Sequence, residues 1–224
     1  MKKIYAKGAL SMLASGNGFI FPAMQSKMEN DYVISYKFHD LVTGNTSLIT
    51  RSVYLLTKFG NHFDTFEQHL DDFINCKTAQ LPNHRIFVTY PDGRAMIFDS
   101  NGNKKWNGIL KYKGFGPADV AVDGNFIWCT FPENNAVIKY NSASMRHDFI
   151  IGGSASGGLN EPHGVFLENQ KLIVTSANNG SICAIDLETF HMESIAWLDE
   201  PVYQYLKTYN SEIVLSESGI YMLS

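Results

Sequence analysis

Short apolar runs separated by turn residues recur at a fixed spacing in the second half of the chain. Residues 117–130 align without a gap on residues 162–175, so that Pro162 stands 45 positions after Pro117. The first unit holds four β-rich runs, at residues 119–122, 126–130, 136–140 and 147–151. Turn residues such as Asp123-Gly124-Asn125 between alternating apolar runs are typical of β-hairpins. A repeated four-stranded meander of this length predicts the blades of a β-propeller.

Weaker copies of the pattern flank these two units. Upstream, residues 85–99 match the second and third runs, residues 105–110 supply a fourth, and the first run falls within residues 73–80. Downstream, residues 201–206, 212–216 and 219–223 give three strands, and we expect the missing fourth from residues 3–7. The remaining copy spans residues 11–49, with strands predicted at residues 18–24, 32–38 and 47–51.

The pattern therefore predicts a single all-β domain, a five-bladed β-propeller of four-stranded antiparallel blades. The blades are expected at about residues 9–52, 53–111, 112–156, 157–198, and 199–224 together with 1–8. The N-terminal strand closes the last blade, which pins the ring and leaves no bare sheet edge at the junction. A chain of 224 residues is long enough to bury a core without disulfides or metals.

One stretch departs from the repeat. Residues 61–70 place apolar side chains at helical spacing and resemble a capping box, which predicts a short helix or an irregular insertion at residues 65–72. His62, His69, Asp71 and Asp72 cluster there. The segment is interpreted as a solvated connection between the first two blades, with a lid over the channel mouth as the alternative.

The second of the two clear units resembles a known repeat. Residues 152–165 join a Gly-rich connection to Asn160-Glu161-Pro162-His163-Gly164-Val165, which resembles the "N-x-P-x-G-V" pattern of NHL-type propellers. Residues 123–130 are also similar to the repeat of the streptogramin lyases (virginiamycin B lyases), which favours "D-G-x-x-W-x-T". The resemblance covers residues 110–224 well and the first hundred residues faintly. The resemblance implies the propeller fold but no single activity, because proteins with these repeats include lyases, lactonases and binding modules.

Composition narrows the class of partner. Formal charge is −4, which disfavours a protein that tracks nucleic-acid phosphates. No stretch approaches the roughly 20 apolar residues that a membrane span needs. Cys76, Cys129 and Cys183 form no CxxC pair, and two of them lie in apolar strand patterns. Buried free thiols in a reducing compartment are expected, so the sequence favours the cytoplasm.

Candidate binding residues lie where the innermost strands begin, because these starts converge at the mouth of the central channel. His163 is the sharpest, since the resemblance places histidines in "P-H-G" contexts near the catalytic metal of streptogramin lyases. Its alternative role is to satisfy a loop carbonyl. Asp119 supplies either a ligand-binding carboxylate or a turn cap. Tyr203 and Gln204, with Tyr205, either contact a sugar or peptide or pack between blades.

Other conspicuous residues are expected to be structural. Trp128 is predicted to pack between blades, and Thr130 and Thr175, at one repeat position, to fix strand ends. The sequence contains no GxxxxGK[ST] phosphate loop, no GxSxG elbow and no HExxH helix.

Two functions remain open at this point. The first is a recognition module that binds a small molecule, peptide or partner protein at the channel mouth or loop face. The second is a metal-assisted lyase or lactonase-type hydrolase, with His163 as the catalytic residue, Asp119 as its partner and a divalent metal in the channel. A structural subunit of a larger assembly is a third possibility.

Overall fold

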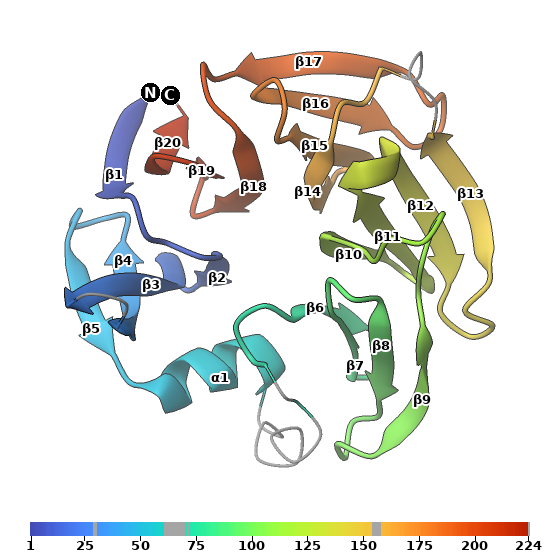
Figure 1. Ribbon diagram of the computed structural model, residues 1–224, viewed down its shortest axis with the longest axis horizontal. Helices are drawn as coiled ribbons and strands as arrows, with labels where there is room; N and C mark the ends of the chain where they lie inside the picture. Colours follow the sequence, from blue (N-terminus) through green and yellow to red (C-terminus); the bar gives the residue numbers. More distant parts are fainter. Residues whose placement is uncertain (29–30, 61–69, 71, 154–157, 224) are drawn as a thin grey trace.

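Five four-stranded antiparallel sheets are arranged in a ring (Figure 1). The structure is a computed structural model and describes residues 1–28, 31–60, 70, 72–153 and 158–223. The predicted five-bladed propeller is confirmed. Blade 1 contains β2 (Leu13–Ser15), β3 (Gly18–Met28), β4 (Asp31–Asp40) and β5 (Thr46–Ile49), and blade 2 contains β6 (Lys77–Leu81), β7 (Arg85–Thr89), β8 (Arg94–Phe98) and β9 (Lys104–Ile109).

The remaining three blades follow in chain order around the ring. Blade 3 contains β10 (Asp119–Asp123), β11 (Phe126–Phe131), β12 (Ala136–Asn141) and β13 (His147–Gly152), with a short 3-10 helix (Pro132–Asn134) between β11 and β12. Blade 4 contains β14 (Pro162–Glu168), β15 (Lys171–Ser176), β16 (Ser181–Asp186) and β17 (Met192–Trp197). Blade 5 contains β18 (Val202–Thr208), β19 (Ser211–Ser216) and β20 (Gly219–Leu223) with β1 (Lys2–Ala6).

The N-terminal strand closes the ring as the sequence predicted. β1 pairs antiparallel with β20, so that Lys2 faces Met222 and Ala6 faces Gly219. The two chain ends consequently lie side by side (Figure 1). The fifth blade is thus assembled from both ends of the chain, and the edge that β20 would expose is covered.

A side-chain cap recurs at the turn between the third and fourth strands. In four blades a carboxylate or amide oxygen at the end of the third strand accepts hydrogen bonds from backbone N–H groups two to four residues later. The residues are Asp40, Asp99, Asn141 and Asp186. Asp and Asn favour such turns because their short side chains mimic a backbone acceptor. The sequence therefore encodes the hairpin at the same place in each of these blades.

The core consists of apolar clusters between neighbouring blades. Trp128 and Val137 of blade 3 pack with Val165, Leu172 and Val174 of blade 4. Trp128 is 1% exposed, which confirms that it packs between blades. Equivalent clusters join blades 2 and 3, blades 4 and 5, and blades 5 and 1. Side chains on facing sheets therefore hold the ring together.

The junction between blades 1 and 2 contains a helix that the sequence analysis did not predict. α1 (Arg51–Phe59) follows β5, so the predicted strand at residues 47–51 is wrong beyond Ile49. Thr50 begins the helix because its Oγ1 accepts a hydrogen bond from Val53 N at 3.3 Å, and Gly60, at φ 73°, ends it. Tyr54 and Phe59 fill the space between the two blades.

The predicted helix or insertion at residues 65–72 lies largely outside the described residues. The same holds for His62, His69 and Asp71. Asp72 is described, and its Oδ1 accepts hydrogen bonds from Ile74 N and Asn75 N. Within the described part of the chain, no helix is long and apolar enough to cross a membrane.

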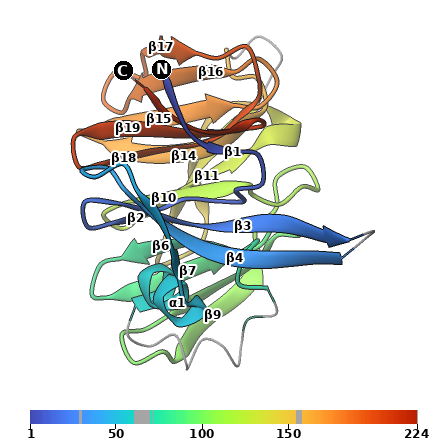
Figure 2. The same cartoon turned by 90° about the vertical axis from the view of Figure 1, so that its left-hand side faces the viewer.

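Strands β3 and β4 are longer than predicted and extend away from the ring as a hairpin (Figure 2). β5 pairs with β4 only at residues 36–39, and β2 pairs with β3 only at residues 18–20. The outer part of the hairpin is therefore two-stranded. Tyr32, Val33 and Ile34 are exposed on it.

Candidate binding site at the channel mouth

The first strands of the five blades converge on the central channel. A cavity of about 160 Å³ lies at their starts. Residues from all five first strands, or just before them, line it together with Lys58 of α1, and the polar ones are Ser11, Lys58, Cys76, Lys77, Thr78, Asp119, Gln204 and Tyr205. The fold thus brings three of the predicted residues, Asp119, Gln204 and Tyr205, to one site. The contacts of each predicted residue show what else it does there.

Asp119 connects blade 3 to blade 4. Its carboxylate is buried at the start of β10, and Oδ2 accepts a hydrogen bond from Val165 N of β14 at 3.1 Å. Thr130 Oγ1 accepts from Asp119 N at 3.0 Å and donates to His163 O at 2.6 Å. Asp119 is therefore held through its carboxylate by blade 4 and through its backbone N–H by Thr130 of blade 3.

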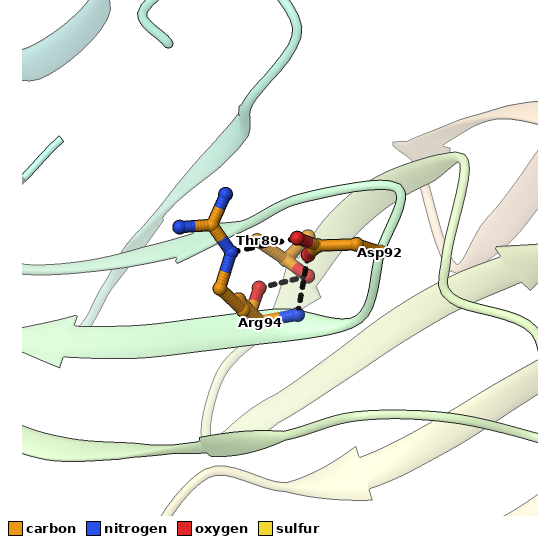
Figure 3. Close-up of polar contacts among 3 residues, drawn as sticks. All are labelled: Thr89, Asp92 and Arg94. Atoms are coloured by element: carbon orange, nitrogen blue, oxygen red, sulfur yellow. Dashed lines mark hydrogen bonds and ion pairs between the residues drawn. The ribbon is translucent and has the colours of Figure 1, made fainter. Parts of the chain in front are cut away.

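The threonines at the ends of the second strands tie strand starts as predicted. Thr175 Oγ1 accepts from Gly164 N at 2.9 Å, which repeats the contact that Thr130 makes with Asp119. Thr89 of blade 2 differs, because its hydroxyl donates to Arg94 O within its own hairpin (Figure 3). Asp92 closes that turn by accepting from Arg94 N and from Arg94 Nε.

His163 contacts the neighbouring blade. Its Nδ1 lies 3.1 Å from Tyr203 O, and because a carbonyl only accepts, Nδ1 carries the hydrogen. The ring meets the Tyr203 ring edge-on at 5.1 Å. Burial, and then the positive charge of Lys77, lower the pKa of His163 from its ordinary value. The imidazole of His163 is therefore neutral and donates from Nδ1.

His163 and Tyr203 do not line the cavity. Both lie at irregularities in strand pairing, between Pro162 and Val165 in β14 and between Val202 and Gln204 in β18. A β-bulge inserts an extra residue and re-aims its side chain. The bulges account for the contact between these two residues. A ligand-binding or catalytic role for either remains a prediction.

Gln204 connects blade 5 to blade 1. Its Oε1 accepts from Met12 N at 2.7 Å, and its Nε2 donates to Met12 O at 2.9 Å. The primary amide therefore pairs with the backbone of the neighbouring blade as a further strand would. Tyr205, which also lines the cavity, packs edge-on against Phe166 of blade 4 at 5.5 Å.

Lys58 is a buried residue of the site that the sequence did not indicate. Its Nζ donates to Tyr54 OH at 3.4 Å, to Ile74 O at 3.3 Å and to Phe73 O. Burial lowers its pKa from the ordinary value, and burial likewise raises the pKa of Cys76 beside it. Prediction of Lys58 would have required prediction of α1. The three acceptors give Lys58 a structural role.

A second cavity of about 290 Å³ adjoins the first along α1. Both are lined by Leu13, Ala14, Lys58 and Thr78, which belong to β2, α1 and β6. The space at the channel mouth therefore continues sideways between blades 1 and 2.

The described residues hold no group of three or more His, Cys, Asp or Glu side chains placed to bind a metal ion. His163 Nδ1 is engaged with Tyr203 O, and Asp119 Oδ2 with Val165 N. The metal-assisted reaction weighed from the sequence has no observation in its favour here, and it remains a prediction.

No family model matches this chain, and no curated protein matches it. Among solved structures, the fold is similar to the crystal structure of the computationally designed Ika4 protein, with a TM-score of 0.50 and 11% sequence identity. The match covers 66% of this chain and 88% of that chain. At this identity the likeness concerns the fold alone. The resemblance to NHL-type propellers and streptogramin lyases remains a prediction.

Proposed function

We propose that this protein is a recognition module that binds a small zwitterionic molecule at the mouth of its central channel. The observation that carries the proposal is the pair formed by Lys77 and Asp119. Both residues line the 160 Å³ cavity. Each begins the first strand of its blade, and each pairs with the equivalent threonine of the second strand, Thr89 or Thr130.

Opposite charges thus stand at the same level on two neighbouring blades. Within the described part of the chain, the two side chains form no ion pair with each other. A compact molecule with one carboxylate and one ammonium group would satisfy both charges, the carboxylate on Lys77 and the ammonium on Asp119. Asp119 is buried and held by Val165 N, so it presents a pre-positioned acceptor.

The size of the cavity limits the ligand. A volume of about 160 Å³ is smaller than the roughly 300–1,000 Å³ typical of drug-sized ligands. Molecules of the size of the small α-amino acids fit this space, whereas a folded partner would have to bind over the rim. A small-molecule ligand is therefore favoured over a peptide or protein at this site.

The test is calorimetric titration of the protein with glycine, alanine, serine and threonine. We expect saturable binding of at least one amino acid, and a loss of about tenfold or more in affinity in each of Lys77→Met and Asp119→Asn, since each removes a charge-assisted contact. Asp119→Asn keeps an acceptor for Val165 N. Lys171→Met, at an exposed site outside the cavity, is the matched control.

Two results would contradict the proposal. One is the absence of heat with all four amino acids. The other is binding that persists unchanged in both variants, or that is equally strong for the N-acetyl amide forms, which carry neither charge.

A further inference from the structure

Blade 3 departs from the other blades at one cross-strand pair. The third residue of the second strand and its neighbour on the third strand are apolar in four blades, where the pairs are Ile20 with Phe38, Phe87 with Ile97, Ile173 with Ala184, and Ile213 with Met222. In blade 3 the pair is Trp128 with Lys139. Blade 3 thus has two hydrogen-bond donors at a position where the other four blades have apolar side chains.

The indole of Trp128 has an unsatisfied polar atom. Its Nε1 is buried and has no hydrogen-bond partner among the described residues. A buried N–H without an acceptor is costly, and the other blades avoid the cost with an apolar side chain. Local departures from a consistent pattern are expected at functional sites. An acceptor on a bound molecule would satisfy this donor.

Trp128 and Lys139 line a cavity of about 290 Å³ between blades 3 and 4. The cavity lies away from the channel mouth, because Asp123 is the last residue of β10 and Gln170 lies in the turn after β14, both at the far ends of the first strands. Phe190, in the turn after β16, completes the wall. None of these residues belongs to the site that Lys77 and Asp119 form.

Lys139 is held beside the indole with its ammonium group incompletely paired. Its Nζ lies 3.8 Å from Asp148 Oδ2, at the outer limit of an ion pair, and 3.8 Å from the centre of the Phe126 ring. It is 5.6 Å from the centre of the Trp128 ring. The side chain is 22% exposed, so a ligand in the cavity can reach it.

Phe190 exposes an aromatic ring while its backbone adopts a left-handed conformation. Its φ is 57°, in the left-handed region that favours glycine, and the corresponding residue of blade 1 is Gly44. The ring is 44% exposed and stacks against Phe149 at 4.5 Å. The left-handed conformation recurs at this turn position in blade 3, where Met145 has a φ of 53°, so the exposed Phe190 ring itself is what offers a contact surface for a ligand.

We infer that this cavity binds a neutral, pyranose-sized polyol, as in one sugar residue. The cavity lining includes one cationic residue, Lys139, and one anionic residue, Asp123, which disfavours a strongly charged ligand. Lysine and indole groups donate to hydroxyl or ring oxygens, the Asp123 carboxylate accepts from hydroxyl groups, and Gln170 does both. The Phe190 ring is available for the apolar C–H face of a sugar.

The test follows the indole N–H signals in ¹H–¹⁵N spectra during titration with the methyl β-glycosides of glucose, galactose and N-acetylglucosamine. The chain has three tryptophans, and the Trp128 signal is identified by its loss in Trp128→Phe. We expect at least one glycoside to shift this signal downfield in a saturable manner. Affinity should fall about tenfold or more in Lys139→Met, which introduces the residue found at the equivalent position in blade 5.

Phe190→Gly separates binding from folding. Glycine relieves the left-handed backbone, so the variant should unfold cooperatively and yet bind the glycoside much more weakly. Lys171→Met again serves as the control with unchanged binding. The inference is overturned if no glycoside shifts the Trp128 signal, or if Lys139→Met and Phe190→Gly, folded as judged by their spectra, bind as the wild type does.

Discussion

Gln204 holds the backbone N–H and C=O of Met12 with the two ends of one amide group, at 2.7 and 2.9 Å. The two residues are 192 positions apart in the chain. They join blade 5 to blade 1 on the channel side, while β1 and β20 join the chain ends on the outside. The ring is therefore closed twice. The Gln204 side chain closes it near the central channel, and the β1–β20 pair closes it at the outer edge.

Replacement of Gln204 by methionine should weaken the inner closure. Methionine fills a similar volume but leaves Met12 N and Met12 O without the amide, so we expect the free energy of unfolding to fall by about 1–3 kcal/mol. Urea denaturation measures the change. Gln80→Met, at an exposed position of β6, is the control and should stay within about 0.5 kcal/mol of the wild type. Equal stability of the two variants would contradict the closure role.

Gly164 should tolerate no side chain, because the backbone of blade 5 passes close to it. An added Cβ would lie 2.7 Å from Tyr203 O and 2.9 Å from Gln204 Cα. We expect Gly164→Ala to destabilise the fold by about 1–3 kcal/mol through overpacking at the blade 4–blade 5 contact.

The comparison for this prediction is Gly124→Ala. Gly124 has open space around it but a φ of 56°, so its replacement costs only the left-handed strain of about 1 kcal/mol. Thermal unfolding of the two variants separates the effects. A smaller loss in Gly164→Ala than in Gly124→Ala would show that the blades can move apart at this point.

The blades could be predicted because their turn chemistry is local. Asp123-Gly124-Asn125 and Asn179-Gly180 mark hairpins in the sequence itself, and the caps at Asp40, Asp99, Asn141 and Asp186 follow from single residues. α1 could not be found in this way, since residues 51–59 are rich in residues that also suit strands. Its apolar face is stabilised by the gap between blades 1 and 2, which exists only in the assembled ring.

The candidate site could likewise be predicted only in part. The repeat register placed Asp119, His163 and Tyr203 at the channel mouth, and of these only Asp119 lines the cavity, together with the neighbouring candidates Gln204 and Tyr205. It did not indicate the bulges in β14 and β18, which turn His163 and Tyr203 toward each other. A bulge adds one residue without a strong sequence signature. Lys58 was missed because it reaches the mouth from a helix rather than from a blade.

The stability of the protein should depend on pH through His163. Burial lowers its pKa in the folded state, so the unfolded chain binds a proton at a higher pH than the folded protein does. Stability is therefore full above the ordinary histidine pKa of about 6.5 and decreases as the pH falls toward the lower folded value. The slope from one histidine is at most about 1.4 kcal/mol per pH unit.

Urea denaturation at a series of pH values from about 5 to 8, the range over which histidine titrates, tests this dependence. His163→Gln should reduce the slope of the free energy of unfolding against pH. The test compares this slope and not the absolute stability of the variant. A residual slope of the same sign is expected from His39, whose pKa burial also lowers. H84Q, at an exposed turn, should follow the wild type. An unchanged slope in His163→Gln would show that the imidazole is not buried as described.

The three cysteines should resist thiol reagents in the folded protein, in an order set by their surroundings. Burial raises the pKa of Cys76, Cys129 and Cys183, which suppresses the reactive thiolate. Cys129, 0% exposed between blades, should be modified by iodoacetamide only on global unfolding, whereas Cys183, 8% exposed, should react first. Cys76 is also 0% exposed but lines the channel cavity, so it should react between them, at a rate that slows when a ligand occupies the mouth. Peptide mass spectrometry over time gives the three rates. Modification of Cys129 as fast as that of Cys183 would mean that blades 2 and 3 separate readily, contrary to the packing of Cys129 with Phe87 and Ile97.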